Sequence, residues 1–137
     1  MKITWKDFDE AAHEIDWKFQ HSNITTIVGL QRGGLPLAVK LSNLMDMPMK
    51  VLDYQTRDGK TTMEELSDRL FDLDILVSET LFVDDMCDSG KTIKDIQCLY
   101  PDARFAVLCT RRKDLVEFSP IEIDEADESW IEFPWEK

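Results

Sequence analysis

The stretch Leu81–Ile93, "LFVDDMCDSGKTI", runs a hydrophobic segment directly into three aspartates and then into a glycine turn. Asp84, Asp85 and Asp88 lie within five residues of one another, so their carboxylates repel unless something offsets the charge. A bound cation, a polyhydroxylated ligand or plain solvent would each serve. The nature of that partner decides what this segment does.

Around this stretch, short apolar runs alternate with segments of helical periodicity. Apolar residues recur at three- and four-residue steps from Trp5 to Phe19, which predicts a helix with Thr4 as its N-cap. This β-α alternation predicts an α/β fold, a doubly wound, mainly parallel sheet flanked by helices, in a single domain of residues 1–137. The expected strands are 24–30, 49–54, 81–85 and 104–109, and further helices are expected from Leu37, Met63 and Ile93.

The segment Gln55–Glu79 is harder to interpret. It opens with a polar, glycine-containing loop, and a helix is expected from about Met63, with Thr62 and Glu65 placed for a capping box. Residues 74–78, "DILVS", fit a strand as well as the end of that helix.

Charge and composition limit the classes of function. The formal net charge is −12, which disfavours binding to a nucleic acid. We expect a cytoplasmic protein, since no apolar run is long enough to span a membrane and the first residues are too polar for a signal peptide. The three cysteines, Cys87, Cys98 and Cys109, are scattered along the chain, so we expect reduced thiols that serve as packing residues. The chain has only two histidines, His13 and His21, which disfavours a zinc site.

Two glycine-bearing loops, residues 31–34 and 88–92, are expected at strand ends, where open α/β sheets bind ligands. In the second loop, successive backbone N–H groups at the start of a helix would form a phosphate cradle. A P-loop is excluded, because that motif needs a glycine where this chain has Asp85. The loop also supplies hydroxyl donors, a positive charge and room for close approach, through Ser89, Thr92, Lys91 and Gly90.

The segment "FVDDMCDSGKT" resembles the phosphoribosyl-diphosphate (PRPP) signature of the type I phosphoribosyltransferases, and "VGLQRGGLPLAVKLSNLM" resembles their pyrophosphate loop and following helix. The segments "ITW", "LYPDARFAVLCTR" and "DESWIEFPWE" look most like the bacterial xanthine-guanine branch of that family. The resemblance covers nearly the whole chain and is weakest from Gln55 to Glu79. It implies the type I fold, with a C-terminal hood that we expect to be reduced because the sequence stops at "FPWEK".

The resemblance also implies roles for the PRPP side of the site. Asp84 and Asp85 would face the ribose hydroxyls and the water shell of Mg²⁺, the expected cofactor. The 5-phosphate would lie on residues 88–92, and Arg32 with Gly33 would hold the pyrophosphate. Asp88 resembles the general base of the family, near N7 of the purine.

For the base, the resemblance implies three further residues. Arg111 stands where the family has a lysine that donates to the 6-oxo group, and arginine can donate to that oxygen too. Trp130 would stack on the purine, and the main chain near Ile131 would approach its 2-substituent. Tyr54, Arg57 and Lys60 would supply polar contacts from the lid.

The implied function is therefore transfer of phosphoribose from PRPP to a 6-oxopurine, in purine salvage, by a Mg-dependent enzyme. Two alternatives stay open: a phosphoribosyltransferase for another base, such as adenine or orotate, and a PRPP-binding regulator of the same fold. Regulators of nucleic acids need a basic surface or an added domain, which the charge of −12 and the short chain disfavour. We expect a homo-oligomer, either a dimer or a tetramer.

Overall fold

A computed structural model describes residues 1–54 and 61–136. Its five strands form one sheet in the order β2-β1-β3-β4-β5, and every neighbouring pair is parallel. The predicted doubly wound α/β architecture is confirmed. The strands are β1 (Thr26–Leu30), β2 (Met49–Leu52), β3 (Thr80–Cys87), β4 (Arg104–Thr110) and β5 (Ile121–Glu122).

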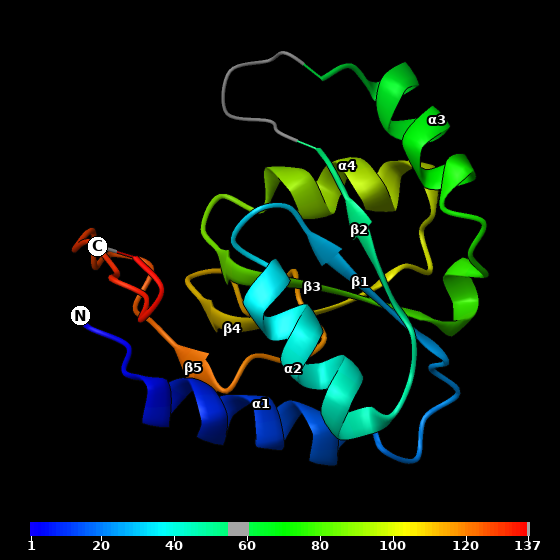
Figure 1. Ribbon diagram of the computed structural model, residues 1–137. Helices are drawn as coiled ribbons and strands as arrows, with labels where there is room; N and C mark the ends of the chain where they lie inside the picture. The colour runs from blue at the N-terminus through cyan, green and yellow to red at the C-terminus, as the bar shows by residue number, and fades with distance from the viewer. Residues whose placement is uncertain (55–60, 137) are drawn as a thin grey trace.

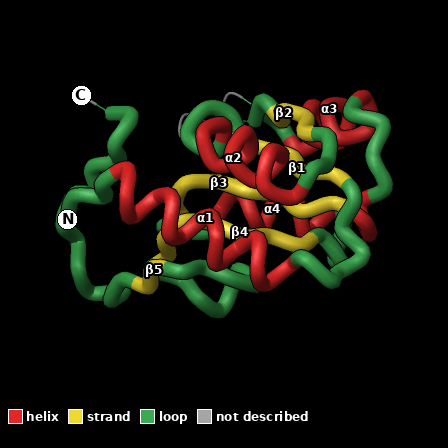
Figure 2. The backbone as a smooth tube through the Cα atoms, turned by 60° about the horizontal axis from the view of Figure 1, so that its bottom comes forward, coloured by secondary structure: helices red, strands yellow, loops and turns green. Residues whose placement is uncertain are grey.

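Helices cover both faces of this sheet. Two of them pack against one face and each other, and the other two cover the opposite face, as Figures 1 and 2 show. They are α1 (Trp5–Phe19) and α2 (Leu35–Met45) on the first face, and α3 (Met63–Asp72) and α4 (Lys91–Leu99) on the second.

Alternation along the strands divides the apolar residues between two cores. In β3, Leu81 and Val83 face α1 and α2, whereas Phe82 faces α3 and α4 and stacks on Phe105 at 5.3 Å between ring centroids. All four side chains are buried. The continuous apolar run that leads into the three aspartates is therefore a strand buried on both faces.

The segment between β2 and β3 also takes a definite form where it is described. The helix expected near Met63 begins there, and the Thr62 hydroxyl caps it by accepting from the Glu65 N–H at 3.1 Å. Residues 74–78 form no strand; the chain instead makes a short 3₁₀ turn at Val77–Glu79 (η1). Residues 55–60 lie outside the described chain.

Two strands, β3 and β5, differ from the prediction made from the sequence. The predicted strand 81–85 continues to Cys87, since Met86 and Cys87 still pair with Cys109 and Thr110 of β4. Strand β5 was not predicted, because two residues are too short for a detectable alternation. It extends the sheet beside β4 and directs the chain toward the C-terminal segment.

The N-terminal and C-terminal segments lie side by side (Figure 1). Lys2 forms an isolated parallel bridge with Glu132, and the Ile3 N–H donates to the Glu132 carbonyl at 2.8 Å. Ile131 and Phe133 are buried with the α1 side of the core. Residues 130–133 are thus supported by the start of the chain. No helix in the described residues is long and apolar enough to cross a membrane.

Candidate functional site

The candidate site lies where the winding of the sheet changes direction. Strands β1 and β3 are parallel neighbours, but the chain leaves β1 into α2 on one face and β3 into α4 on the other. In doubly wound sheets the carboxyl ends of such a strand pair leave a crevice that receives the ligand. Both predicted glycine loops are found at this point.

The loop after β1 rests directly on the acidic end of β3. A Cβ atom on Gly33 would come within 2.2 Å of Asp85 Oδ2, and one on Gly34 within 2.6 Å of the Val83 carbonyl oxygen. Only glycine fits this close approach. Arg32, whose peptide bond to Gln31 is cis, is exposed at the loop surface. The predicted partners Arg32, Gly33 and Asp85 are therefore brought together.

The end of β3 presents the three aspartates differently. Asp84 and Asp85 are half-buried within the strand, and Asp84 Oδ1 accepts from the Asp85 N–H at 2.8 Å. Asp88 follows the strand and its side chain is 73% exposed. The half-buried Asp85 carboxylate lies against Gly33, whereas the Asp88 side chain is exposed beyond the end of the strand.

The turn from Asp88 into α4 depends on Gly90. This residue has φ of 79°, in the left-handed region that favours glycine, and a Cβ there would lie 2.1 Å from Leu115 Cδ1. Ser89 Oγ accepts from the Lys91 N–H at 3.3 Å and so closes the turn. Helix α4 starts directly after this turn, at Lys91.

The helix starts differ between the site and the rest of the molecule. Helices α1 and α3 are capped by the hydroxyls of Thr4 and Thr62. The N-caps of α2 and α4 are instead Gly34 and Gly90, which make no side-chain hydrogen bond. Each of these helices starts just after the carboxyl end of a strand, β1 or β3, and the positive end of a helix dipole suits phosphate groups.

Arg111 is placed between the two sides of the site. It follows β4, and its guanidinium donates from Nε to the Asp127 carbonyl at 2.6 Å and from Nη2 to the Ser129 carbonyl at 2.7 Å. Its Nη1 lies 3.4 Å from Asp88 Oδ1 and 3.9 Å from Met86 Sδ. Only 10% of the side chain is exposed. The residue expected to contact the base thus makes its hydrogen bonds within the protein.

The other two expected base contacts occupy different environments. Trp130 is 76% exposed, whereas Ile131 is buried against the α1 side of the core. The Trp130 ring is therefore open to a ligand, and Ile131 anchors the backbone beside it. Sequence reasoning missed the support from Lys2 and Ile3, because a pairing so distant along the chain leaves no local pattern.

A second contact that was not predicted links the segment after β2 to helix α4. The Tyr54 hydroxyl donates to Asp95 Oδ2 at 2.7 Å, and Lys91 Nζ lies 2.9 Å from the same oxygen. Burial, followed by the hydrogen bond to Asp95, raises the pKa of Tyr54 to about 12. Tyr54 is thus a buried brace rather than an exposed lid contact. Arg57 and Lys60, the other expected lid residues, lie outside the described residues.

The cysteines do not supply nucleophiles to the site. Cys87 and Cys109 are buried as expected, and burial raises the pKa of both thiols, that of Cys109 to about 12. A neutral thiol is a poor nucleophile. The expectation of a packing role is wrong for Cys98, which is exposed on α4.

The residues present fit a magnesium ion held jointly with a substrate. Within residues 1–54 and 61–136 no group of three or more metal-ligating side chains occurs. Asp84 and Asp85 supply hard carboxylate oxygens beside the Gly33 loop, and Mg²⁺ is commonly bound by one or two carboxylates together with water and substrate phosphates.

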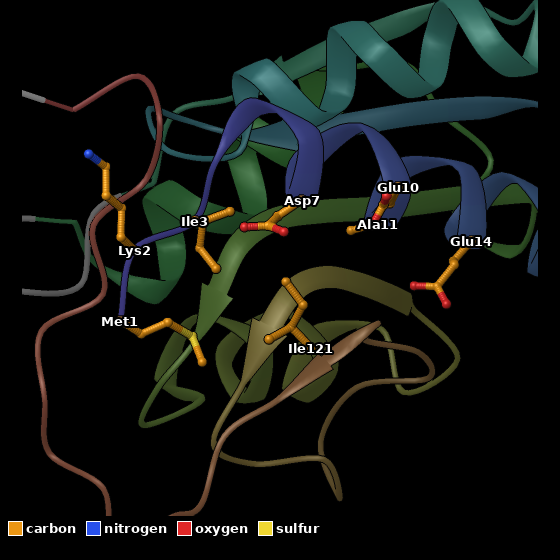
Figure 3. A pocket seen from close by; sticks show the side chains of 8 residues that line it. All are labelled: Met1, Lys2, Ile3, Asp7, Glu10, Ala11, Glu14 and Ile121. Atoms are coloured by element: carbon orange, nitrogen blue, oxygen red, sulfur yellow. The ribbon is translucent and has the colours of Figure 1, made fainter.

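A separate cavity of about 290 Å³ lies between the start of the chain, α1 and β5 (Figure 3). Its charged lining is mostly acidic, with Asp7, Glu10 and Glu14 on one side of α1 and Lys2 opposite. Such a lining repels phosphate. This cavity is therefore distinct from the crevice at the ends of β1 and β3.

Comparison with known proteins identifies the family. The phosphoribosyl transferase domain model matches residues 4–136, so the chain belongs to the phosphoribosyltransferase family, which indicates a glycosyltransferase. Xanthine-guanine phosphoribosyltransferase of Ruegeria sp. (strain TM1040) is 26% identical over 98% of this chain and 84% of its own length. The protein of the same name from Idiomarina loihiensis is 24% identical over 98% of this chain and 85% of its own length.

Solved structures show the same fold. The purine phosphoribosyltransferase of Pyrococcus horikoshii Ot3 is 28% identical, has a TM-score of 0.64 and covers 100% of this chain and 94% of its own. A hypothetical protein of Neisseria gonorrhoeae with bound ppGpp is 18% identical, with a TM-score of 0.70 over 100% of this chain and 90% of its own. The latter likeness concerns the fold alone.

Proposed function

We propose that the protein is a purine phosphoribosyltransferase that transfers the 5-phosphoribosyl group from PRPP to xanthine, guanine or hypoxanthine and releases pyrophosphate. The observation that carries this proposal is the contact between the Gly33 loop and Asp85 at the switch point of the sheet. This contact supports a site in which the loop of Arg32 would hold the pyrophosphate beside Asp84 and Asp85, with the 5-phosphate on residues 88–92. The relatives named xanthine-guanine phosphoribosyltransferase support the choice of a 6-oxopurine.

PRPP would be bound along the carboxyl ends of β1 and β3. Its 5-phosphate would accept hydrogen bonds from the N–H groups of residues 88–92, with Ser89, Lys91 and Thr92 adding side-chain donors. Asp84 and Asp85 would accept from the ribose hydroxyls and from the water shell of the metal. Magnesium would supply charge neutralisation at the pyrophosphate when bound.

In the reaction, a ring nitrogen of the purine bonds to C1 of the ribose while the bond from C1 to the pyrophosphate oxygen breaks. The sugar carries positive charge in this transition state, and the departing oxygen carries negative charge. Arg32 and the start of α2 would stabilise the leaving pyrophosphate, while the aspartates face the sugar. Asp88, exposed at the mouth of the crevice, would accept the proton that the purine loses.

The direct test is pyrophosphate release from PRPP and Mg²⁺ with guanine, xanthine, hypoxanthine, adenine and orotate, measured against a reaction without base. We expect release with one or more of the three 6-oxopurines and the matching nucleotide as second product. Turnover with adenine or orotate alone would identify a phosphoribosyltransferase for a different base.

A second candidate is a nucleotide-binding regulator of the same fold. The position of Arg111 favours it, because that guanidinium donates to two protein carbonyls rather than standing free for a purine. The Neisseria gonorrhoeae protein with bound ppGpp offers a precedent for the fold. Binding of PRPP or ppGpp in calorimetry, with no turnover of any base, would support the regulator.

A further inference from the structure

The guanidinium of Arg111 connects two parts of the site that are far apart in the sequence. It donates to the carbonyls of Asp127 and Ser129, and it lies 3.4 Å from the carboxylate of Asp88. The Arg111 side chain is only 10% exposed, whereas that of Asp88 is 73% exposed, so the contact between the two is open to solvent on the Asp88 side. A single side chain therefore bridges the candidate general base and residues 124–130, which we call the base-side loop.

The base-side loop has little regular structure of its own. Its internal hydrogen bonds are short-range turns, including Ala126 N–H to Asp124 Oδ1 and Ser129 N–H to Asp127 Oδ1, each at 2.9 Å. A looser contact to the sheet edge joins Arg112 Nε to Glu125 Oε1 at 3.8 Å. The two hydrogen bonds from Arg111 thus tie the loop most closely to the end of β4.

We propose that Arg111 is a positioning residue, which fixes the base-side loop and Asp88 relative to each other and does not donate to the purine. This inference rests on the proposed function, since the loop ends at Trp130, the expected stacking platform for the base. The Trp130 ring is 76% exposed, and the Trp130 carbonyl accepts from the N-terminal ammonium of Met1 at 3.1 Å. Arg111 holds the carbonyl of Ser129, the residue before Trp130.

The chemistry of arginine explains why this residue can take such a role. A guanidinium is planar and presents donors in several fixed directions, so it can serve two carbonyls and a carboxylate at once. A lysine ammonium is a compact charge on a flexible stem and would hold at most part of this arrangement. A lysine suits a single hydrogen bond to a 6-oxo group, which is the role implied by the family resemblance.

Arg111→Lys separates the two roles. If Arg111 donates to the base, the lysine restores the residue type that the family resemblance implies, and turnover is kept. If it positions the loop, the lysine loses the fork, and we expect kcat to fall about 10- to 100-fold with little change in the KM for PRPP. Arg104→Lys is the matched control, because Arg104, at the start of β4, pairs with Glu117 and Asn23, which lie outside the base-side loop.

A readout without turnover tests the loop itself. Hydrogen exchange followed by mass spectrometry should show several-fold faster deuterium uptake by a peptide of residues 124–130 in Arg111→Lys and Arg111→Gln. In Arg104→Lys this peptide should exchange as it does in the unmodified protein. Unchanged uptake in both Arg111 variants would overturn the proposal, whether or not the protein turns over any purine.

A double-mutant cycle tests the link to Asp88. If Arg111 acts through Asp88 and the loop, Arg111→Lys should lower kcat far less in an Asp88→Asn background than alone. If the two substitutions lower kcat independently, so that their fold-changes multiply, the positioning role is contradicted. A fully active Arg111→Lys would contradict it too. Either result leaves the proposed transferase activity standing. Faster exchange in the Arg111 variants of a protein that turns over no base would refute the transferase and keep the loop restraint.

Discussion

The side of the site that we propose binds PRPP, residues 84–92, and the side that we propose binds the base, Arg111 with residues 124–131, meet at Asp88 but are held by different contacts. We call them the PRPP side and the base side. The PRPP side is a strand and the turn that follows it, closed by Gly90 and laid against the Gly33 loop. The base side is a segment of turns, tied to β4 by one guanidinium and to the start of the chain by backbone pairing.

This difference separates two ways of building a site. Chemical groups that lie close together in the sequence, on elements of regular structure, are positioned by local geometry and by the sheet. Groups on an irregular segment are positioned by a few long-range hydrogen bonds, so one side chain can change the geometry of the whole segment. Substitutions on the PRPP side should therefore alter particular steps, and substitutions on the base side should alter recognition.

The largest effect is expected where the two sides meet. Asp88→Asn keeps the shape of the side chain but cannot accept a proton, so kcat should fall about 10²–10⁴-fold. The affinity for PRPP, measured by calorimetry, should stay near that of the unmodified protein. By contrast, Asp85→Asn should weaken binding of PRPP with magnesium first. Wild-type turnover by Asp88→Asn across a range of pH would remove proton transfer from the role of Asp88.

On the PRPP side, Arg32→Ala removes the cation expected to stabilise the leaving pyrophosphate. Turnover should fall about 10²–10³-fold, as when other donors that stabilise a transition state are removed. The fold should be kept, because Arg32 is exposed and its loss leaves the core intact. Lys40→Ala is the control; it removes a cation from α2 that pairs with Asp9 at 2.7 Å. A lower melting temperature with normal turnover in Arg32→Ala would instead assign a structural role.

Gly33→Ala tests the close contact between Gly33 and the carboxylate of Asp85. The added Cβ would lie 2.2 Å from Asp85 Oδ2, so the carboxylate must move, and the KM for PRPP should rise about 10- to 100-fold. Gly29→Ala is the comparison, since its Cβ would meet Ala38 Cβ at 2.7 Å inside the core. That variant should lose stability in thermal unfolding. A Gly33→Ala protein with unchanged KM would show that Asp85 does not contact PRPP.

On the base side, Trp130→Ala should raise the KM for the purine about 10-fold, because base–aromatic stacking is worth roughly 1–3 kcal/mol. Its melting temperature should hardly change, since the side chain is 76% exposed. Trp135→Ala should instead lower the melting temperature and leave the KM for the purine unchanged, because the Trp135 ring stacks on Phe133 at 5.1 Å between centroids and packs against Phe8. Equal KM values for Trp130→Ala and the unmodified protein would exclude stacking.

The smallest effect is expected in the pH dependence of stability, through the buried thiol of Cys109 and the buried hydroxyl of Tyr54. In the folded protein the pKa of Cys109 is raised from 9.0 to about 12 and that of Tyr54 from 10.0 to about 12, chiefly by burial. Above pH 9 the unfolded chain loses these protons first, so the free energy of unfolding should fall as the pH rises toward 12. Each group contributes up to about 1.4 kcal/mol per pH unit in its window.

Chemical denaturation between pH 8 and 11 measures this slope. Cys109→Ala should make the decline shallower, whereas Cys98→Ala, at an exposed position of α4, should leave it unchanged. Identical slopes for all three proteins would show that Cys109 does not contribute.

Much of the fold could be predicted from the sequence, including the strand that leads into the residues proposed to bind PRPP. Helix α1 with its Thr4 cap, the strand leading into Asp84 and the start of α3 after Thr62 each follow from periodicity and capping over a few residues. The pairing of β5, the continuation of β3 to Cys87 and the brace from Tyr54 to Asp95 could not be predicted. Each depends on a partner distant in the chain, which no local pattern reveals.

The sequence by itself determined that two glycine loops follow buried strands, that three aspartates stand at the end of one of them, and that the chain resembles a phosphoribosyltransferase. Only the tertiary structure decided which groups touch. It placed Gly33 against Asp85, and it placed the Arg111 guanidinium within hydrogen-bond distance of the carbonyls of Asp127 and Ser129. Motifs record the order of residues along the chain, whereas the partner of a long side chain is set by whichever acceptors the packed sheet brings within hydrogen-bond distance.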